Sequence, residues 1–293
     1  VRVHEQARAT LEDGDFGGAT ASLAVADTGG QVQARGCKLH DCKSAGVWVT
    51  EGGRAEVENC ELWACEHTAL GVRDEGSHLR VLQTRVRETG NSAVWATAQA
   101  KAEVKGCDFS GCGDGFAAVV VSAGAQALVQ SSQLHDTGSN GVWVKEGSSA
   151  EVVDCELWAC AHSALAVCDE GSHLRVHQTR VRDTVQNAVW AYAQGRVALK
   201  GCDLSACGYP AITAGTGAHA QVQDCQVHDT ASHAVWVKER GRAEVVDCAL
   251  WACARAACAV DGEGSVLEVH QTRVRDTTQN AVWAENQGRV DIK

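Results

Sequence analysis

Several residue types are rare or missing in this 293-residue chain. It has no methionine, one proline, two tyrosines and three phenylalanines, and it contains no apolar run long enough to cross a bilayer as a helix. The opening residues Val1 to His4 lack the basic and apolar regions of a signal peptide. A formal charge of −11 argues against binding to nucleic acid phosphates. Because methionine is absent, we expect a processed chain or an excerpt.

The residues that are abundant point to a folded, repetitive chain. Apolar residues make up 45% of the sequence and charged residues 22%, which excludes disorder. Thirty glycines accompany the single proline, there are fifteen cysteines, and nine of the fourteen aromatic residues are tryptophan. The length suits one large domain or two of ordinary size.

A fixed repeat runs along the sequence. The segment Glu61 to Cys65 (ELWAC) returns at 156–160, and again as ALWAC at 249–253, so the long period is 95 and then 93 residues. Each long period holds four shorter units of 23 to 25 residues. Each unit is marked by a small residue two places before an apolar one: Cys37, Cys60, Thr84, Cys107, Ser132, Cys155, Thr179, Cys202, Cys225, Cys248 and Thr272. Repeats of this length are typical of solenoids.

Within each unit the apolar residues alternate with polar ones, as in half-buried strands. In the unit around Cys60, Ala55 and Val57 alternate with polar residues, Leu62 follows, and Leu70 and Val72 alternate again. Glycines and small residues separate these segments. The pattern predicts an all-β fold, a single-stranded right-handed parallel β-helix of about 12 coils of 23–24 residues with a four-coil super-repeat of 93–95 residues.

The repeat covers nearly the whole chain, so we expect one domain over residues 1–293. Residues 1–30 are expected to form an irregular first coil with a turn insertion from Glu12 to Gly18, and residues 290–293 are expected to begin a truncated or final coil. Uncapped coil ends leave open strand edges. They predict end-to-end or assembly contacts.

The residues Gly46 to Leu62 (GVWVTEGGRAEVENCEL) resemble the parallel β-helix repeat of the pectin-lyase-like superfamily. They are most similar to the non-catalytic β-helix of F-box-only-type ubiquitin-ligase subunits and to carbohydrate-binding and sugar-hydrolase-type domains. The resemblance implies the fold, whereas the motif is not specific for one function. That family often carries asparagine at the inward corner, where this chain has cysteine or threonine.

Thirteen of the fifteen cysteines fall in two columns, the marker column and the one five residues later. Threonine or serine replaces cysteine at the remaining positions of both columns, and neither residue can replace a disulfide partner or a thiolate ligand. We therefore expect reduced, buried thiols, and with them an intracellular, reducing compartment, cytoplasmic or organellar. Cys258 is expected to point inward, and Cys168 to lie on the outer side near a corner.

Tryptophan recurs on every second coil at one outward position. The strand pattern Gly/Ala-Val-Trp-Val points its valines inward, and neighbouring strands lie about 4.8 Å apart. The six residues of this tryptophan strip are the candidate binding residues: Trp48, Trp95, Trp143, Trp190, Trp236 and Trp283. Exposed apolar patches mark contact surfaces. The strip could stack against a glycan, contact a protein, or simply shield the strands beneath it.

A second outward column carries histidine, tryptophan, arginine and serine in turn: His40, Trp63, Arg87, Ser110, His135, Trp158, Arg182, Ser205, His228, Trp251 and Arg275. Trp63 beside Arg87, and Trp158 beside Arg182, are expected to form cation–π pairs. In a parallel column, Arg85 lies between Glu61 and Asp108, which predicts charge pairing between coils. These columns are interpreted as mainly structural.

Carboxylates gather after the tryptophan-bearing strands and form what we call the acidic ridge: Glu51, Asp74, Glu75, Glu146, Asp169, Glu170, Glu239 and Glu263. They could hold calcium between Glu51 and Asp74, or perform acid and base chemistry on a polysaccharide. Glycine and glutamine occupy the same turns on other coils, which favours a solvated ridge. No residue interrupts the repeat as a catalytic centre usually does.

The sequence therefore predicts a non-catalytic binding or scaffold solenoid that contacts a protein partner or a glycan through the tryptophan strip. No catalytic residue, metal or cofactor is expected, nor a nucleic acid partner or a membrane span. Two alternatives stay open. One is a carbohydrate-active enzyme of the lyase, hydrolase or epimerase type, and the other is a purely structural subunit of a larger assembly.

Overall fold

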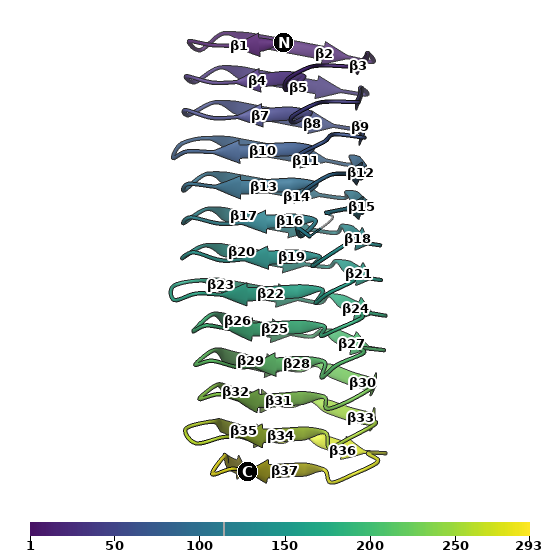
Figure 1. The fold of residues 1–293 in the computed structure, drawn as a ribbon, viewed down its shortest axis with the longest axis vertical. Coiled ribbons are helices and arrows are strands. Elements are labelled where there is room, and N and C mark those ends of the chain that lie inside the picture. Colours follow the sequence, from purple (N-terminus) through teal and green to yellow (C-terminus); the bar gives the residue numbers. More distant parts are fainter. Residues whose placement is uncertain (114) are drawn as a thin grey trace. The chain divides into compact units, whose positions relative to one another are not determined.

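The computed structural model describes residues 1–113 and 115–293, and in this part of the chain every regular element is a β-strand. The strands form three parallel sheets. Each strand pairs with the strand three places later in the chain, so one coil contributes one strand to each sheet in turn (Figure 1). Counted over the described residues, there are thirteen coils, against the dozen expected from the sequence.

The first sheet carries the tryptophan strip. Its strands are β1 (Arg2–Val3), β4 (Ala24–Ala26), β7 (Val47–Val49), β10 (Leu70–Arg73), β13 (Val94–Thr97), β16 (Val119–Val121), β19 (Val142–Val144), β22 (Leu165–Cys168), β25 (Val189–Tyr192), β28 (Ile212–Ala214), β31 (Val235–Lys238), β34 (Cys258–Asp261) and β37 (Val282–Glu285).

The second sheet contains β2 (Arg8–Glu12), β5 (Gln31–Arg35), β8 (Arg54–Glu58), β11 (His78–Leu82), β14 (Lys101–Lys105), β17 (Gln126–Gln130), β20 (Ser149–Val153), β23 (His173–His177), β26 (Arg196–Lys200), β29 (His219–Gln223), β32 (Arg242–Val246), β35 (Val266–His270) and β38 (Arg289–Ile292). Most of its strands span five residues, and their outward positions are mainly charged or polar.

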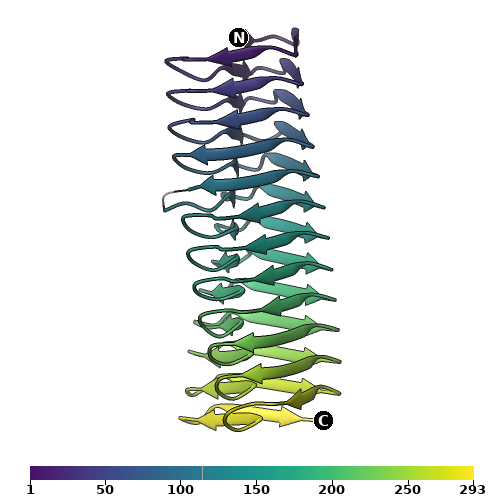
Figure 2. The same cartoon turned by 90° about the vertical axis from the view of Figure 1, so that its right-hand side faces the viewer.

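The third sheet contains β3 (Asp15–Gly17), β6 (Lys38–His40), β9 (Glu61–Trp63), β12 (Arg85–Thr89), β15 (Asp108–Cys112), β18 (Gln133–His135), β21 (Glu156–Trp158), β24 (Arg180–Arg182), β27 (Asp203–Ser205), β30 (Gln226–Thr230), β33 (Ala249–Cys253) and β36 (Arg273–Arg275). In each coil the chain passes from the first to the second and then to this third sheet by short turns (Figure 2).

The coils belong to two compact units. The first comprises Val1–Trp143 with Ser148–Ala150, and the second comprises Val144–Gly147 with Glu151–Lys293. In both units the core consists of inward columns of valine, leucine, alanine and cysteine, such as Val57, Leu62 and Val72 in one coil, which are fully buried. Burial of these stacked aliphatic columns is the main force that holds each unit together.

Both ends of the chain contain β-strands. Residues 1–30, where an irregular first coil is expected, contain four short strands, β1 to β4. Asp13 turns the chain at a positive φ of 47°, which lets Asp15–Gly17 pair with Lys38–His40, so the expected turn insertion is in part a strand. At the other end, residues 290–293 fall in and after β38, the second strand of the last described coil.

Candidate functional site

All six residues of the tryptophan strip lie at outward positions of the first sheet. The residues that flank the first five are fully buried, such as Val47 and Val49 beside Trp48, as the alternation predicts, whereas Val282 and Ala284 beside Trp283 are not. The register partners of these tryptophans on the neighbouring coils are smaller residues: Gly71 and Val120 in the first unit, and Ala166, Thr213 and Ala259 in the second. A bulky ring on every second coil therefore has room to lie over its smaller neighbour.

In the first unit, the rings of Trp48 and Trp95 meet across the coil between them. The indole of Trp48 covers Gly71, since a Cβ added to that glycine would come 2.2 Å from two ring atoms. Trp48 meets Trp95 edge-on, with ring centroids 6.3 Å apart at 67°. The Nε1 of Trp95 donates a hydrogen bond of 3.2 Å to Ser122 Oγ, which fixes the direction of that ring.

In the second unit, polar neighbours hold the indoles. Trp190 stacks on Tyr192 with centroids 4.0 Å apart, and the Nζ of Lys238 lies 4.8 Å from the ring centre of Trp236. Within the strip, Trp95 is the most exposed at 37%, and its other members are half-buried. The rings thus cover their own sheet while keeping part of their surface accessible.

A buried histidine packs against the last two tryptophans. His233 is 3% exposed, its ring centre lies 6.3 Å from Trp236 and 6.1 Å from Trp283, and its Nδ1 lies 3.0 Å from the carbonyl oxygen of Ala256. Burial, followed by the charge of Arg255, lowers the pKa of His233. Earlier tryptophan-bearing coils place smaller residues at this position: Ala45, Ser92, Asn140 and Asn187. In the sequence, this position is marked only by lying three residues before each tryptophan of the strip.

The acidic ridge borders the outward edge of the strip. Asp74 Oδ2 accepts hydrogen bonds from Thr50 Oγ1 at 2.5 Å and from the backbone N–H of Glu51 at 3.3 Å. The Thr50 hydroxyl is the largest cause of a lowered pKa for Asp74, and the Thr216 hydroxyl does the same for Glu239. Both carboxylates are therefore held ionised by their neighbours.

In the third sheet, each super-repeat stacks a histidine, a tryptophan and an arginine. The rings of His40 and Trp63 are nearly parallel at 8° with centroids 4.5 Å apart, and Arg87 covers the other face of Trp63 at 5.5 Å. In the second unit, His228, Trp251 and Arg275 repeat this arrangement. The expected cation–π pairs of Trp63 with Arg87 and of Trp158 with Arg182 are both present.

Each of these histidines lies between two carboxylates. His40 Nδ1 is 2.7 Å from Asp41 and its Nε2 is 2.7 Å from Asp15, and hydrogen bonding to these partners, Asp41 first, raises the pKa of His40. His135 and His228 have equivalent pairs of aspartates at 2.6 to 2.9 Å. With both ring nitrogens bonded to carboxylates, the doubly protonated imidazolium of His40 is favoured.

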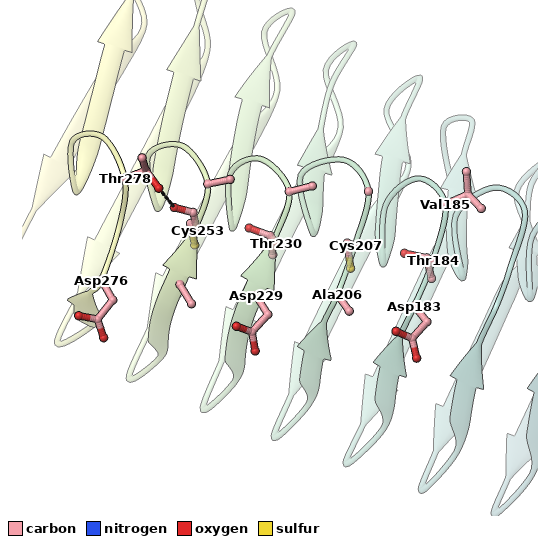
Figure 3. A pocket seen from close by; sticks show the side chains of 14 residues that line it. Asp183, Thr184, Val185, Ala206, Cys207, Asp229, Thr230, Cys253, Asp276 and Thr278 are labelled. Carbon is pink, nitrogen blue, oxygen red and sulfur yellow. Dashed lines mark hydrogen bonds between the residues drawn. The ribbon is translucent and has the colours of Figure 1, made fainter.

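An aspartate row, not anticipated from the sequence, runs beside these histidines. In the second unit, Asp183, Asp229 and Asp276 line one side of a shallow groove on alternate coils, with Ala206 and Ala252 between them (Figure 3). Arg182 and His228 bind two of these carboxylates at 2.8 and 2.6 Å. The signal was the alternation of acid with alanine directly after the histidine column.

All fifteen cysteines are buried and free. In the marker column, Cys60 Sγ donates to the Glu58 carbonyl and accepts from the Cys37 N–H, and Thr84 Oγ1 makes the same two kinds of bond with Leu82 and Cys60. The column is thus a hydrogen-bonded ladder. Cys258 points inward as expected, whereas Cys168, expected on the outer side, is only 3% exposed.

Among residues 1–113 and 115–293, no group of three or more histidine, cysteine or acidic side chains is arranged to hold a metal ion. A calcium ion between Glu51 and Asp74 would compete with the hydrogen bonds that Asp74 already accepts from the Thr50 hydroxyl and the Glu51 N–H. No helix in these residues is long and apolar enough to cross a membrane.

The family model described as right handed beta helix region matches residues 1–127, 90–196 and 163–293. No curated protein matches the sequence.

Solved structures with the same fold include carbohydrate-active enzymes. The periplasmic alginate epimerase AlgG matches with a TM-score of 0.60 and 8% identity, over 92% of this chain and 78% of that one. The A-module of the Azotobacter vinelandii mannuronan C-5 epimerase AlgE4 has a TM-score of 0.54 and 12% identity, over 90% of this chain and 91% of that one. Pectate lyase Pel9A has a TM-score of 0.49 and 10% identity, over 98% of this chain and 70% of that one.

Proposed function

The chain belongs to the right-handed β-helix family, and from its outward side chains we propose that it is a non-catalytic solenoid that binds an extended glycan along the tryptophan strip. In such a fold the inward columns form the core, so that function depends on the outward columns. The observation that carries the proposal is the close contact of the Trp48 ring with Gly71, one coil away from Trp95.

An indole that covers a glycine and stays half-exposed leaves ring surface on which a sugar ring can stack. Tryptophans recur on every second coil, so their backbone positions lie about 9.6 Å apart given a strand separation of about 4.8 Å. The rings of Trp48 and Trp95 lean toward each other, with centroids 6.3 Å apart, and together form one aromatic surface over the coil between them. A repeated surface of this kind suits a regular, extended polysaccharide. The fold neighbours include epimerases named for alginate and mannuronan, which is consistent with a glycan partner.

The histidine triads of the third sheet do not favour an enzyme. Both nitrogens of His40 are bonded to carboxylates of the protein, so neither nitrogen is directed at a substrate. The arrangement recurs at His135 and His228 with the same partners, as a structural motif repeated with the coils would. A carbohydrate-active enzyme is the alternative function, and turnover of a polysaccharide by the purified protein would support it.

The test compares tryptophans on two faces of the first unit. Replacing Trp48 and Trp95 with Ala removes the strip, whereas Trp63→Ala, in the third sheet, serves as the matched control. We expect the double variant to bind a soluble β-1,4-glucan at least about tenfold more weakly, since each lost aromatic contact is worth about 1 kcal/mol. Equal binding by the wild type and the double variant would refute the role of the strip. Capture of a protein at the strip, with no glycan bound, would favour the protein-partner alternative.

We also propose that the protein resides in a reducing compartment. The buried, free thiols support this, because neighbouring coils place cysteines such as Cys42 and Cys65 with their sulfur atoms only 2.8 Å apart. Alkylation of unfolded protein taken from its native source, with and without prior reduction, tests the idea. Fifteen labelled cysteines without reduction are expected, and protected, disulfide-bonded pairs would contradict it.

A further inference from the structure

We infer that the tryptophan strip selects neutral glycans and rejects polymers of uronic acids. This inference rests on the proposed function and names the ligand class that the strip accepts. The charged residues that decide this lie at the edge where the strands of the first sheet end, next to any glycan bound on the indoles.

Carboxylates lie within electrostatic reach of the indoles. Thr50 is two residues beyond Trp48 on the same outward face, about 6.6 Å along the strand. Its hydroxyl binds Asp74 Oδ2 at 2.5 Å, so a negative charge is fixed beside the ring. The spacing of about 6.6 Å between Trp48 and Thr50 along the strand is shorter than the Debye length of about 8 Å at physiological ionic strength. A sugar carboxylate stacked over Trp48 would feel this charge.

The cations in one column of this edge are already paired. Each basic residue two places beyond the tryptophan column is followed by an acid that binds it: Arg73 with Asp74 at 3.3 Å, Lys145 with Glu146 at 3.2 Å, and Lys238 with Glu239 at 3.0 Å. A uronate carboxylate would have to displace a protein carboxylate from its cation. A neutral sugar requires no such exchange.

A hollow beside Trp236 shows the same excess of negative charge. It is lined by Lys238, Arg240, Glu239, Asp261 and Glu263, so three carboxylates outnumber two cations. The lowered pKa of Glu239, caused first by its hydrogen bond from Thr216, keeps that group charged into mildly acidic solution. The repulsion of a polyanion therefore persists at neutral pH and somewhat below it.

The opposite edge supplies little positive charge. The residues four places before the tryptophan column are Ser44, His67, Asn91, Phe116, Ser139, His162, Gln186, Tyr209, Ser232, Arg255 and Gln279. Arg255 is the one permanent cation among them, while Phe116 and Tyr209 are 46% and 58% exposed. Amides, hydroxyls and aromatic rings suit the hydroxyl groups and apolar faces of neutral sugars.

The test measures the binding of two soluble probes, a neutral β-1,4-glucan and a polymannuronate of matched length, to the full chain at low and high salt. The ridge variant carries Glu51→Gln, Glu75→Gln, Glu146→Gln and Glu170→Gln, all at exposed positions. The control variant removes an equal number of negative charges from the second sheet. It carries Glu12→Gln, Glu58→Gln, Glu151→Gln and Glu244→Gln. It separates a local effect of the ridge from an effect of the net charge.

We expect the wild type to prefer the neutral glucan by about tenfold or more at low salt, since like charges held close together disfavour binding of the polyanion. The ratio of glucan affinity to polymannuronate affinity should fall at high salt. At low salt it should be severalfold smaller in the ridge variant than in the wild type, and unchanged in the control variant. Polymannuronate binding as tight as glucan binding, or an unchanged preference in the ridge variant, overturns the inference alone. Binding of neither probe overturns the proposed function and the inference with it.

Discussion

The indole of Trp48 rests directly on Gly71, which is its register partner on the next coil. The ring fills the space that a side chain would otherwise occupy, and this makes the glycine part of the platform. Ala259, the corresponding partner of Trp236, already carries a Cβ, so the strip does not need glycine at every such position.

Gly71→Ala should lift the Trp48 ring off the sheet. A Cβ placed 2.2 Å from ring atoms cannot be accommodated without movement of the indole, so we expect a loss of about 1 to 3 kcal/mol in the free energy of unfolding. Urea denaturation measures that loss. The near-ultraviolet circular dichroism of the Trp48–Trp95 pair should change as well. Ala259→Gly removes a Cβ in the same column and serves as the control. A stability and spectrum equal to those of the wild type would show that the ring does not rest on Gly71.

His233 should make the second unit sensitive to acid. Its pKa is lowered in the folded state, so the neutral form stabilises the fold above the unfolded pKa of about 6.5 and this stabilisation is lost as pH falls below it. His233→Asn introduces the residue that Asn187 supplies two coils earlier, and it should remove that dependence. Thermal unfolding of both proteins at pH 7.5 and pH 5 measures the effect. A constant difference between the two proteins would count against a buried neutral imidazole.

His40 should act with the opposite sign. Its pKa is raised by Asp41 and Asp15, so its contribution is complete below about pH 6.5 and is lost as pH rises through the folded pKa. The stability difference between the wild type and His40→Ala should be largest in mild acid and should decline above neutrality. The double variant Asp15→Asn and Asp41→Asn removes both partners, and it should return the NMR titration of His40 to its ordinary range. An unshifted titration in the wild type would refute the imidazolium assignment.

The fold followed from the sequence because each coil repeats one rule. Val47 and Val49 flank Trp48 at a period of two, and the unit recurs every 23 or 24 residues, so the inward and outward positions are set by local pattern alone. The pairing of Arg85 with Glu61 and Asp108 followed in the same way, since all three occupy one column.

Features that join different columns could not be predicted so easily. The position of His40 between Asp15 and Asp41 depends on how far its ring tilts toward the preceding coil, which the spacing of residues does not give. The ring of Trp48 could have projected into solvent as easily as it lies on Gly71. Cys168 occupies an outward position, and its burial beside Asp169 reflects the crowding of the ridge.

The exchange of cysteine for threonine in the marker column can be tested through the ladder of hydrogen bonds it forms. Cys60→Thr should retain stability within about 1 kcal/mol, because a hydroxyl can donate to Glu58 and accept from the Cys37 N–H as the thiol does. Cys60→Val has the shape of threonine and lacks the hydroxyl, so it leaves the buried Cys37 N–H unpaired. We expect it to cost about 1 to 3 kcal/mol, measured from urea unfolding midpoints. If the two variants were equally stable, the column would be a packing feature alone, and the resemblance between Cys60 and Thr84 would be one of size and not of hydrogen bonding.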